Sequence, residues 1–213
     1  MAVHHPATIV PTKLELLRAW VPRQPWAGGV TPDVLTQLGA YRFDDPDGEV
    51  GIETHLLGTA SGQVLQVPLT YRGAPREGAD ATLVTTMTHT TLGDRWIYDA
   101  CHDPVYPAVL AEVVRTAGRE AELFTATPDG LVPNPLTTHV RGSGGGPGAL
   151  GAPVEVRQRG ADTRIRAGST TLVLHRRPDR GASEPGPSPT GPSLTGTWPG
   201  QDDPVLLVSV EER

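Results

Sequence analysis

The chain has 213 residues, which is the length of one ordinary domain or of one domain with long appendages, so two full domains are not expected. A net charge of −6 gives no general attraction to polyanions, and no apolar run approaches the ~18 residues that span a bilayer, so neither nucleic acid nor membrane is expected as a partner. The single cysteine excludes an intrachain disulfide framework, and no basic segment followed by an apolar stretch opens the chain, so a cytoplasmic protein is expected.

The N-terminal segment carries a clear helix signal. The Thr12 hydroxyl can accept from the Glu15 amide while the Glu15 carboxylate reaches back to the Thr12 amide, which is a capping box. An apolar stripe at helical spacing follows, and Pro22 forbids continuation, so the pattern predicts a helix over 13–21. A threonine before a proline also predicts a short helical turn over 32–38.

The middle of the chain alternates apolar and polar residues, with β-branched and aromatic side chains separated by turn-forming dipeptides. This pattern predicts a run of antiparallel strands, and a second helix begins at Asp103-Pro104 and ends near Gly118. The strands are expected near 40–44, 49–58, 63–72, 81–90 and 94–98.

The C-terminal part combines further strands with segments rich in glycine and proline. A strand over 137–142 and a flexible Gly-rich loop over 141–153 lead into a small meander over 154–159, 162–167 and 170–176. Half of the residues in 178–193 are Gly or Pro, which predicts a disordered Pro/Gly/Ser-rich insertion over 179–193. The domain is expected to span 1–178, and residues 194–213 are expected to form a terminal β-hairpin that rejoins the same sheet.

No motif in the sequence predicts a cofactor or a metal. Asp99 and Asp103 are explained by turn formation and helix capping, and a nucleophilic pair of Cys101 and His102 would need mutual contact and a third orienting group. The glycine run over 142–148 lacks the Lys-Ser or Lys-Thr of a phosphate loop, and the seven histidines show no zinc-ligand spacing. We expect His55 and His89 to be ordinary strand residues.

Two surface features remain open. Residues 154–180 carry seven arginines against three acids, which is typical of a solvated sheet face, with an anion-binding or partner-binding face as the alternative. The tryptophans are expected in packing roles, although Trp26 lies in a Pro/Gly loop and is a candidate for exposed contact.

Three phrases of the sequence resemble a known family. They are HHPATIVPTKLELLRAWVP over 4–22, VPLTYRGAP over 67–75 and RWIYDACHDPV over 95–105. Together they are similar to the N-terminal cap domain of actinobacterial maltokinases, and more closely to stand-alone cap-like proteins sometimes labelled 1,4-alpha-glucan branching proteins. The resemblance covers roughly residues 3 to 116 well and the terminal hairpin more loosely.

The resemblance implies an α+β fold in which a curved antiparallel β-sheet, with a cystatin-like half-barrel as one form, packs against two or three helices. In full-length kinases the cap lies against the nucleotide-binding lobe. Catalysis belongs to downstream lobes, which need a His-Gly-Asp type catalytic loop with an Asn and then an Asp for magnesium. His102-Asp103-Pro104 lacks that Asn, so the resemblance implies a cap without kinase lobes. A branching enzyme would resemble a (β/α)₈ barrel of at least ~250 residues, which the length rejects.

Three functions follow as hypotheses. The first is a non-catalytic accessory module that docks on a sugar kinase or another α-glucan enzyme, in α-glucan, maltose or trehalose metabolism. The second is a carbohydrate-binding or carbohydrate-modifying protein with a pocket of its own, and the third is a structural remnant. Aromatic and carboxylate side chains suit such a pocket. The candidate contacts for a ligand or partner are Trp26, Tyr71, Arg72, Trp96, Tyr98, Asp99, His102 and Asp103.

Overall fold

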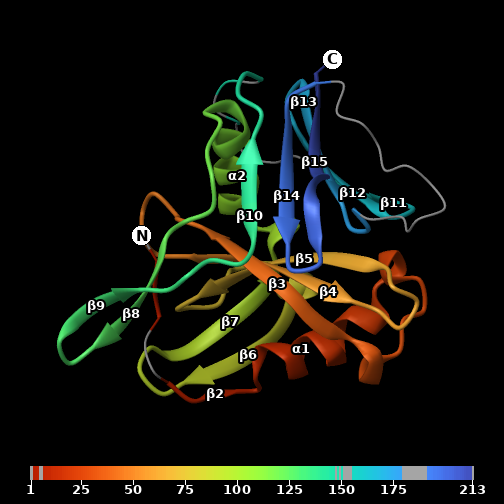
Figure 1. Cartoon of the computed structure of the whole chain (residues 1–213). Helices are drawn as coiled ribbons and strands as arrows, with labels where there is room; N and C mark the ends of the chain where they lie inside the picture. The colour runs from red at the N-terminus through yellow and green to blue at the C-terminus, as the bar shows by residue number, and fades with distance from the viewer. Residues whose placement is uncertain are drawn as a thin grey trace.

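The computed structural model describes residues 2–4, 7–146, 148, 150, 155–178 and 191–212. Within these residues the chain forms two six-stranded sheets, a small three-stranded sheet and the helices α1 (Lys13–Trp20) and α2 (Val105–Arg115) (Figure 1). The first sheet has the order β2 (Ile9–Val10), β6 (Leu83–His89), β7 (Gly93–Asp99), β5 (Val64–Arg72), β4 (Gly51–Gly58), β3 (Thr36–Phe43). The second has the order β10 (His139–Gly142), β14 (Ser193–Trp198), β15 (Gln201–Glu212), β13 (Thr170–His175), β12 (Asp162–Ala167), β11 (Glu155–Arg159). In the third, β1 (Ala2–His4) pairs with β8 (Leu123–Thr127), which pairs with β9 (Gly130–Pro133).

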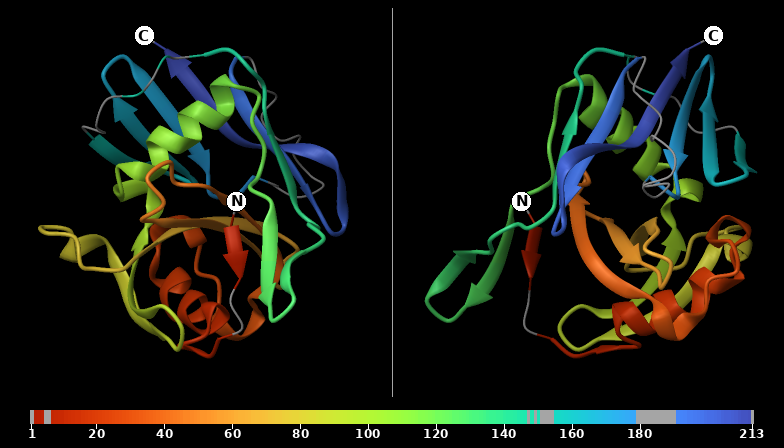
Figure 2. Two further views of the ribbon diagram at one scale, coloured as in Figure 1. Left: turned by 90° about the vertical axis from the view of Figure 1, so that its left-hand side faces the viewer. Right: turned by 45° about the vertical axis from the view of Figure 1, so that its right-hand side comes forward.

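The first sheet curls around α1 as a half-barrel (Figure 2). Both faces of this sheet are covered, and successive side chains of β5 point alternately to one face and to the other. Leu65, Val67 and Leu69 pack toward α1, whereas Gln66 points the other way, where its side-chain amide donates to the carbonyls of His175 and Leu207 at 3.0 Å each. The fold class is therefore the α+β curved antiparallel sheet predicted from the sequence.

The second sheet and α2 cover the outer face of the half-barrel. One apolar cluster joins Ile52 and Leu56 of β4 to Leu110 of α2 and to Leu172 and Leu207 of the second sheet, and all five are at most 1% exposed. The molecule is thus layered, with α1 inside the first sheet and α2 and the second sheet outside it (Figure 1). The sequence pattern did not separate the two sheets, because alternation predicts strands but not their partners.

Local sequence signals account for the helix boundaries. The capping box at Thr12 and Glu15 is present, and α1 gives way to a 3₁₀ turn at Val21–Arg23, where Pro22 stands. The predicted helical turn over 32–38 is wrong in its extent. It is a 3₁₀ turn at Pro32–Val34, and β3 begins at Thr36 because pairing with β4 extends that strand toward the proline.

Part of the glycine-rich loop is bonded to the end of α2. The amides of Gly142, Gly144 and Gly145 donate to the carbonyls of Gly118, Val114 and Arg115 at 2.9–3.0 Å. Carbonyls at a helix C-terminus have no partner within the helix, and this segment satisfies some of them. The flexibility expected of the loop over 141–153 stays a prediction. Within the loop over 141–153, residues 147, 149 and 151–153 lie outside the described residues.

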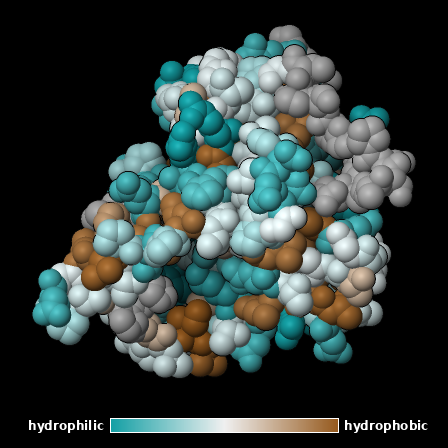
Figure 3. Space-filling model, in the orientation of Figure 1, coloured by the Kyte–Doolittle hydropathy of each residue, from teal (hydrophilic) through white to brown (hydrophobic). Residues whose placement is uncertain are grey.

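Some elements were not predicted, and others cannot be compared. The hairpin of β8 and β9 was missed, and its side chains Leu131 and Val132 are exposed. Figure 3 shows apolar and polar residues interspersed over the surface of the molecule. The insertion expected over 179–193 falls mostly outside the described residues. β14 and β15 lie between β10 and β13 of the second sheet.

Among the described helices, none has the length and apolar character needed to cross a bilayer.

Candidate functional site

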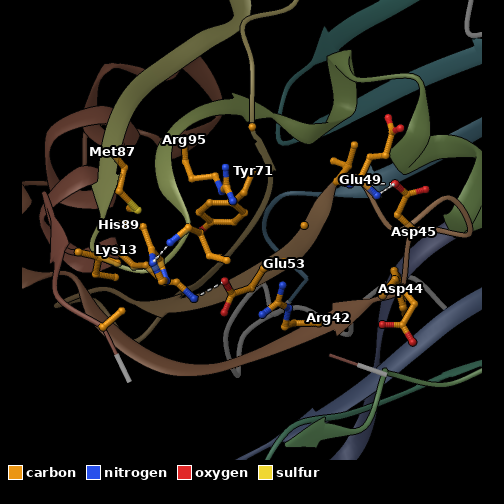
Figure 4. Close-up of a pocket in the computed structure, with 18 residues that line it drawn as sticks. Lys13, Arg42, Asp44, Asp45, Glu49, Glu53, Tyr71, Met87, His89 and Arg95 are labelled. Carbon is orange, nitrogen blue, oxygen red and sulfur yellow. Dashed lines mark hydrogen bonds and ion pairs between the residues drawn. The ribbon is translucent and has the colours of Figure 1, made fainter. Parts of the chain in front are cut away.

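A cavity of about 490 Å³ opens at one end of the half-barrel (Figure 4). Its walls come from the start of α1, from β3, β4 and β5, from the hairpin of β6 and β7, and from the loop over 44–50. The chain thus gathers charged groups from segments that are far apart in sequence. The labelled lining residues are Lys13, Arg42, Asp44, Asp45, Glu49, Glu53, Tyr71, Met87, His89 and Arg95.

The cavity wall is built around an ion pair between Lys13 and Glu53. Lys13 is the first residue of α1, and Glu53 occupies an alternating position of β4 that faces α1, so the Lys13 Nζ reaches the Glu53 Oε2 at 2.5 Å. Burial by itself would raise the pKa of Glu53, but the positive charges of Lys13 and Arg42 and the neighbouring His55 outweigh it and lower the pKa to about 2. Glu53 is therefore ionised although it is only 8% exposed.

Behind this pair lies a hydrogen bond between His55 and Tyr71. The His55 Nε2 is 3.0 Å from the Tyr71 hydroxyl, and the Lys13 Nζ lies 5.6 Å from the centroid of the Tyr71 ring. Burial lowers the pKa of His55 to about 4, despite the opposing attraction of Glu53, and burial also raises the pKa of Tyr71 well above its ordinary value. Both side chains are therefore neutral at pH 7.

Two guanidinium groups add hydrogen-bond donors to the cavity. The Nε of Arg42 is buried without a hydrogen-bond partner among the described residues, and Arg95 uses its Nη1 to donate to the Asp94 carbonyl at 3.1 Å. Donors from Lys13, Arg42 and Arg95 thus line the same cavity as the ionised Glu53 carboxylate and the Tyr71 ring, with Asp44, Asp45 and Glu49 as further acceptors. Such a set can hold hydroxyl or carboxylate groups of a small polar ligand.

The described residues include no group of three or more His, Cys, Asp or Glu side chains placed to hold a metal ion. The cavity therefore offers a ligand polar side chains from the protein, without a metal site in that part of the chain.

Of the eight candidate contacts predicted from the sequence, Tyr71 alone lines this cavity. Arg72 and Asp103 instead bind one another, with the Arg72 Nε and Nη2 donating to the two Asp103 carboxylate oxygens at 2.6 and 2.7 Å and the Thr70 hydroxyl adding a bond of 2.9 Å. Burial would raise the pKa of Asp103, but these donors hold it below its ordinary value. Asp103 also accepts from the Val105 amide at 3.3 Å, but the N-cap of α2 is Pro104 and not Asp103 as predicted, because the helix begins one residue later, at Val105.

Tyr98 and His102 meet through Arg76. The Tyr98 hydroxyl accepts from the Arg76 amide at 2.8 Å, the Arg76 Nη1 donates to the His102 carbonyl at 3.1 Å, and the His102 side chain itself is exposed. Trp96 lies half-buried on β7 opposite Thr86. These residues brace the loop after β5 against the turn before α2.

Asp99 and Trp26 belong to a buried cluster around Arg176, whose guanidinium contacts Asp99, Thr163 and Trp26. The Arg176 Nη2 donates to both Asp99 carboxylate oxygens at 2.9 and 2.7 Å, its Nε donates to the Thr163 hydroxyl at 2.8 Å, and the guanidinium lies 4.5 Å from the Trp26 ring centroid. Trp26 is 3% exposed beneath this cation, so it packs as expected of the tryptophans, and the alternative of an exposed contact at Trp26 is wrong. The solvated face expected for the arginines is likewise wrong for Arg176, which is 1% exposed.

Part of the cavity could have been predicted from the alternating pattern of β4. Period-two alternation places Glu53, His55 and Leu57 on one face of β4, and pairing in register brings that strand against β5 and Tyr71. No sequence rule, however, brings Lys13 to a residue forty positions away.

The family comparison agrees with the resemblance found in the sequence. Residues 20–103 match the model of the maltokinase N-terminal cap domain. The matched segment runs from the last residue of α1 through β3–β7 to Asp103, so it contains most of the first sheet. No curated protein matches the chain. The match confirms the similarity to the cap domain over this segment.

Proposed function

We propose that this chain, whose residues 20–103 are similar to the maltokinase N-terminal cap domain, is a non-catalytic accessory module of maltose, trehalose or α-glucan metabolism. It associates with a sugar kinase or another α-glucan enzyme. The observation that carries the proposal is the cap match over the first sheet. In the kinases that this segment resembles, the cap lies against a second body, the nucleotide-binding lobe.

The geometry of the cap-like phrases supports a structural use of their charged residues. The Asp103 carboxylate is fully buried and accepts from Arg72 and Thr70, and the Asp99 carboxylate is held by Arg176. A general base must reach the proton that it abstracts, and neither carboxylate is accessible to do so. Both serve to fix the relation between β5, β7 and the turn before α2.

Association is tested by mixing the full 213-residue chain with a purified intact maltokinase and measuring mass by light scattering during size-exclusion chromatography. A protein kinase that does not act on sugars is the control. The proposal predicts a complex with the maltokinase and none with the control. If the chain elutes alone at concentrations of tens of micromolar, where a transient interface of ordinary size should form, the proposal fails.

The cavity favours a second candidate function, carbohydrate binding. The specific observation is the Tyr71 ring beside the Lys13–Glu53 pair, which presents donors and an acceptor next to an aromatic surface. Calorimetric titration with maltose, trehalose, maltooligosaccharides and glycogen tests it. Glu53→Gln should abolish any heat of binding, whereas Trp96→Phe, outside the cavity, should preserve it. An absence of heat with all four ligands refutes this candidate.

A further inference from the structure

A second hollow, of about 780 Å³, lies beside α2. It adjoins the cavity of the candidate site, because Phe43, Asp44 and Asp45 line both. Its walls are the outward side of α2, the loop over 44–47 and the segment over 119–122. Figure 2 (left) shows these elements together, with the β3–β4 loop in orange beside α2 in green. We call this hollow the α2 groove.

The floor of the α2 groove is apolar. Val105, Ala108, Val109 and Val113 recur along α2 at helical spacing and line the groove, with Phe43 of β3 beneath them. Ala108 is exposed, and Val105 and Val113 are half-buried. Val109 belongs to the apolar core and Val105 and Val113 pack against it, so the floor reaches solvent through Ala108 and the exposed parts of Val105 and Val113. Apolar side chains that remain accessible at the bottom of a hollow suit contact with another molecule.

The rim of the α2 groove is strongly acidic. Six carboxylates line it. The Arg119 guanidinium also lines it, and Arg115 forms an ion pair with Glu112, so two guanidinium groups offset six carboxylates at this rim. The six are Asp44, Asp45, Asp47, Glu112, Glu120 and Glu122.

Internal bonds fix several of these acids in place without removing the negative field. Asp45 accepts from the amides of Glu49 and Val50, and Glu120 accepts from the Val140 amide at 2.8 Å. Hydrogen bonds from neutral amides hold a carboxylate but do not neutralise its charge. Asp47 and Glu122 are exposed at the rim. An apolar floor inside an acidic rim is complementary to a segment that carries both apolar and basic side chains.

We propose that the α2 groove is the docking surface for a basic, amphipathic segment of a partner protein, with apolar side chains on the floor and Lys or Arg side chains at the rim. This inference rests on the proposed accessory function and specifies the chemistry of the partner. Attraction between unlike charges of this kind raises the rate of encounter and weakens as salt screens it.

The probe is a pair of fluorescein-labelled 18-residue peptides with the same leucines on one helical face, one carrying lysine and arginine at the polar positions and the other glutamate. Fluorescence anisotropy with the full chain should show binding of the basic peptide alone. The test variant Asp47→Asn/Glu112→Gln/Glu122→Gln is matched by the control Glu77→Gln/Asp202→Asn/Asp203→Asn, which removes the same charge from exposed positions outside the groove.

The groove variant should weaken binding about tenfold, because three partly screened ion pairs are lost, whereas the control should stay within about twofold. Ala108→Gln, which keeps helix propensity but makes the floor polar, should weaken binding at unchanged net charge. Circular dichroism and thermal unfolding establish that each variant is folded. Equal weakening by both triple variants, or no binding of the basic peptide at low salt, overturns the inference.

The same variants separate this inference from the proposed function. If the chain binds an intact maltokinase and the groove variant binds it as tightly as the control variant does, the groove assignment is wrong and the accessory function stands. If the basic peptide binds in a groove-dependent manner and the kinase does not bind, the accessory function is wrong and the groove assignment stands.

Discussion

Replacing Arg176 by methionine should destabilise the protein strongly, because it leaves the Asp99 carboxylate charged and buried. Arg176 is 1% exposed and its Nη2 lies 2.9 and 2.7 Å from the two Asp99 oxygens. Removing one partner of a buried ion pair costs about 3–5 kcal/mol, a large share of the roughly 5–15 kcal/mol that stabilises an ordinary domain. Asp99 keeps one hydrogen bond, from the Cys101 amide at 3.2 Å, which favours the lower end of that range.

The assay is guanidinium unfolding followed by tryptophan fluorescence, since Trp26 lies against the substituted side chain. The double variant Arg176→Met/Asp99→Asn carries no buried charge and should recover much of the loss, so that the single effects sum to more than the double effect. Arg115→Met removes a partner from the exposed pair with Glu112 and should cost less than about 1 kcal/mol. The reasoning is refuted if Arg176→Met costs less than about 1 kcal/mol or if the two substitutions are additive.

Three further predictions follow from buried or crowded groups. Burial lowers the pKa of His55 from 6.5 to about 4, so the unfolded chain binds a proton at a higher pH than the folded chain does. The free energy of unfolding should therefore fall by about 2–3 kcal/mol as pH drops from 7.5 to 4.5. His55→Gln should flatten this dependence on pH, and an unchanged dependence would contradict the assignment. The Cys101 thiol is fully buried and burial raises its pKa, so it should resist a thiol reagent until the chain unfolds, and rapid labelling of the native protein would show the burial to be wrong. A Cβ at Gly142 would lie 2.1 Å from the Val113 carbonyl oxygen, whereas one at Gly148 would meet nothing within 4 Å. Gly142→Ala should therefore lower the melting temperature by several degrees, and Gly148→Ala should leave it nearly unchanged. Equal effects of the two substitutions would argue against this packing.

Local patterns in the sequence predicted the elements that local forces determine. The capping box at Thr12 predicted the start of α1, and alternation predicted β4 and β5 close to their observed bounds. These signals depend on neighbours within a few residues, so they can be read without knowing the tertiary contacts. The same is true of the turn at Asp99, whose carboxylate accepts from the Cys101 amide.

Contacts between distant segments could not be predicted in this way. Arg176 meets Asp99 across 77 positions, and its local neighbourhood of arginines indicated a solvated face. The candidate residues in the cap-like phrases were chosen by residue type, but most of them bind one another across strands, whereas Lys13 and Arg42 reach the cavity from other elements. Which charged side chains face a cavity depends on sheet curvature and pairing, which a single sequence does not specify.

The most direct test of the accessory function is the rate of maltose phosphorylation by an intact maltokinase at rising concentrations of the full chain. The account predicts a saturable change in that rate, and no turnover of ATP by the chain alone. A rate that does not respond to the chain, together with turnover of ATP by the purified chain that Asp103→Asn abolishes in a folded variant, would contradict it.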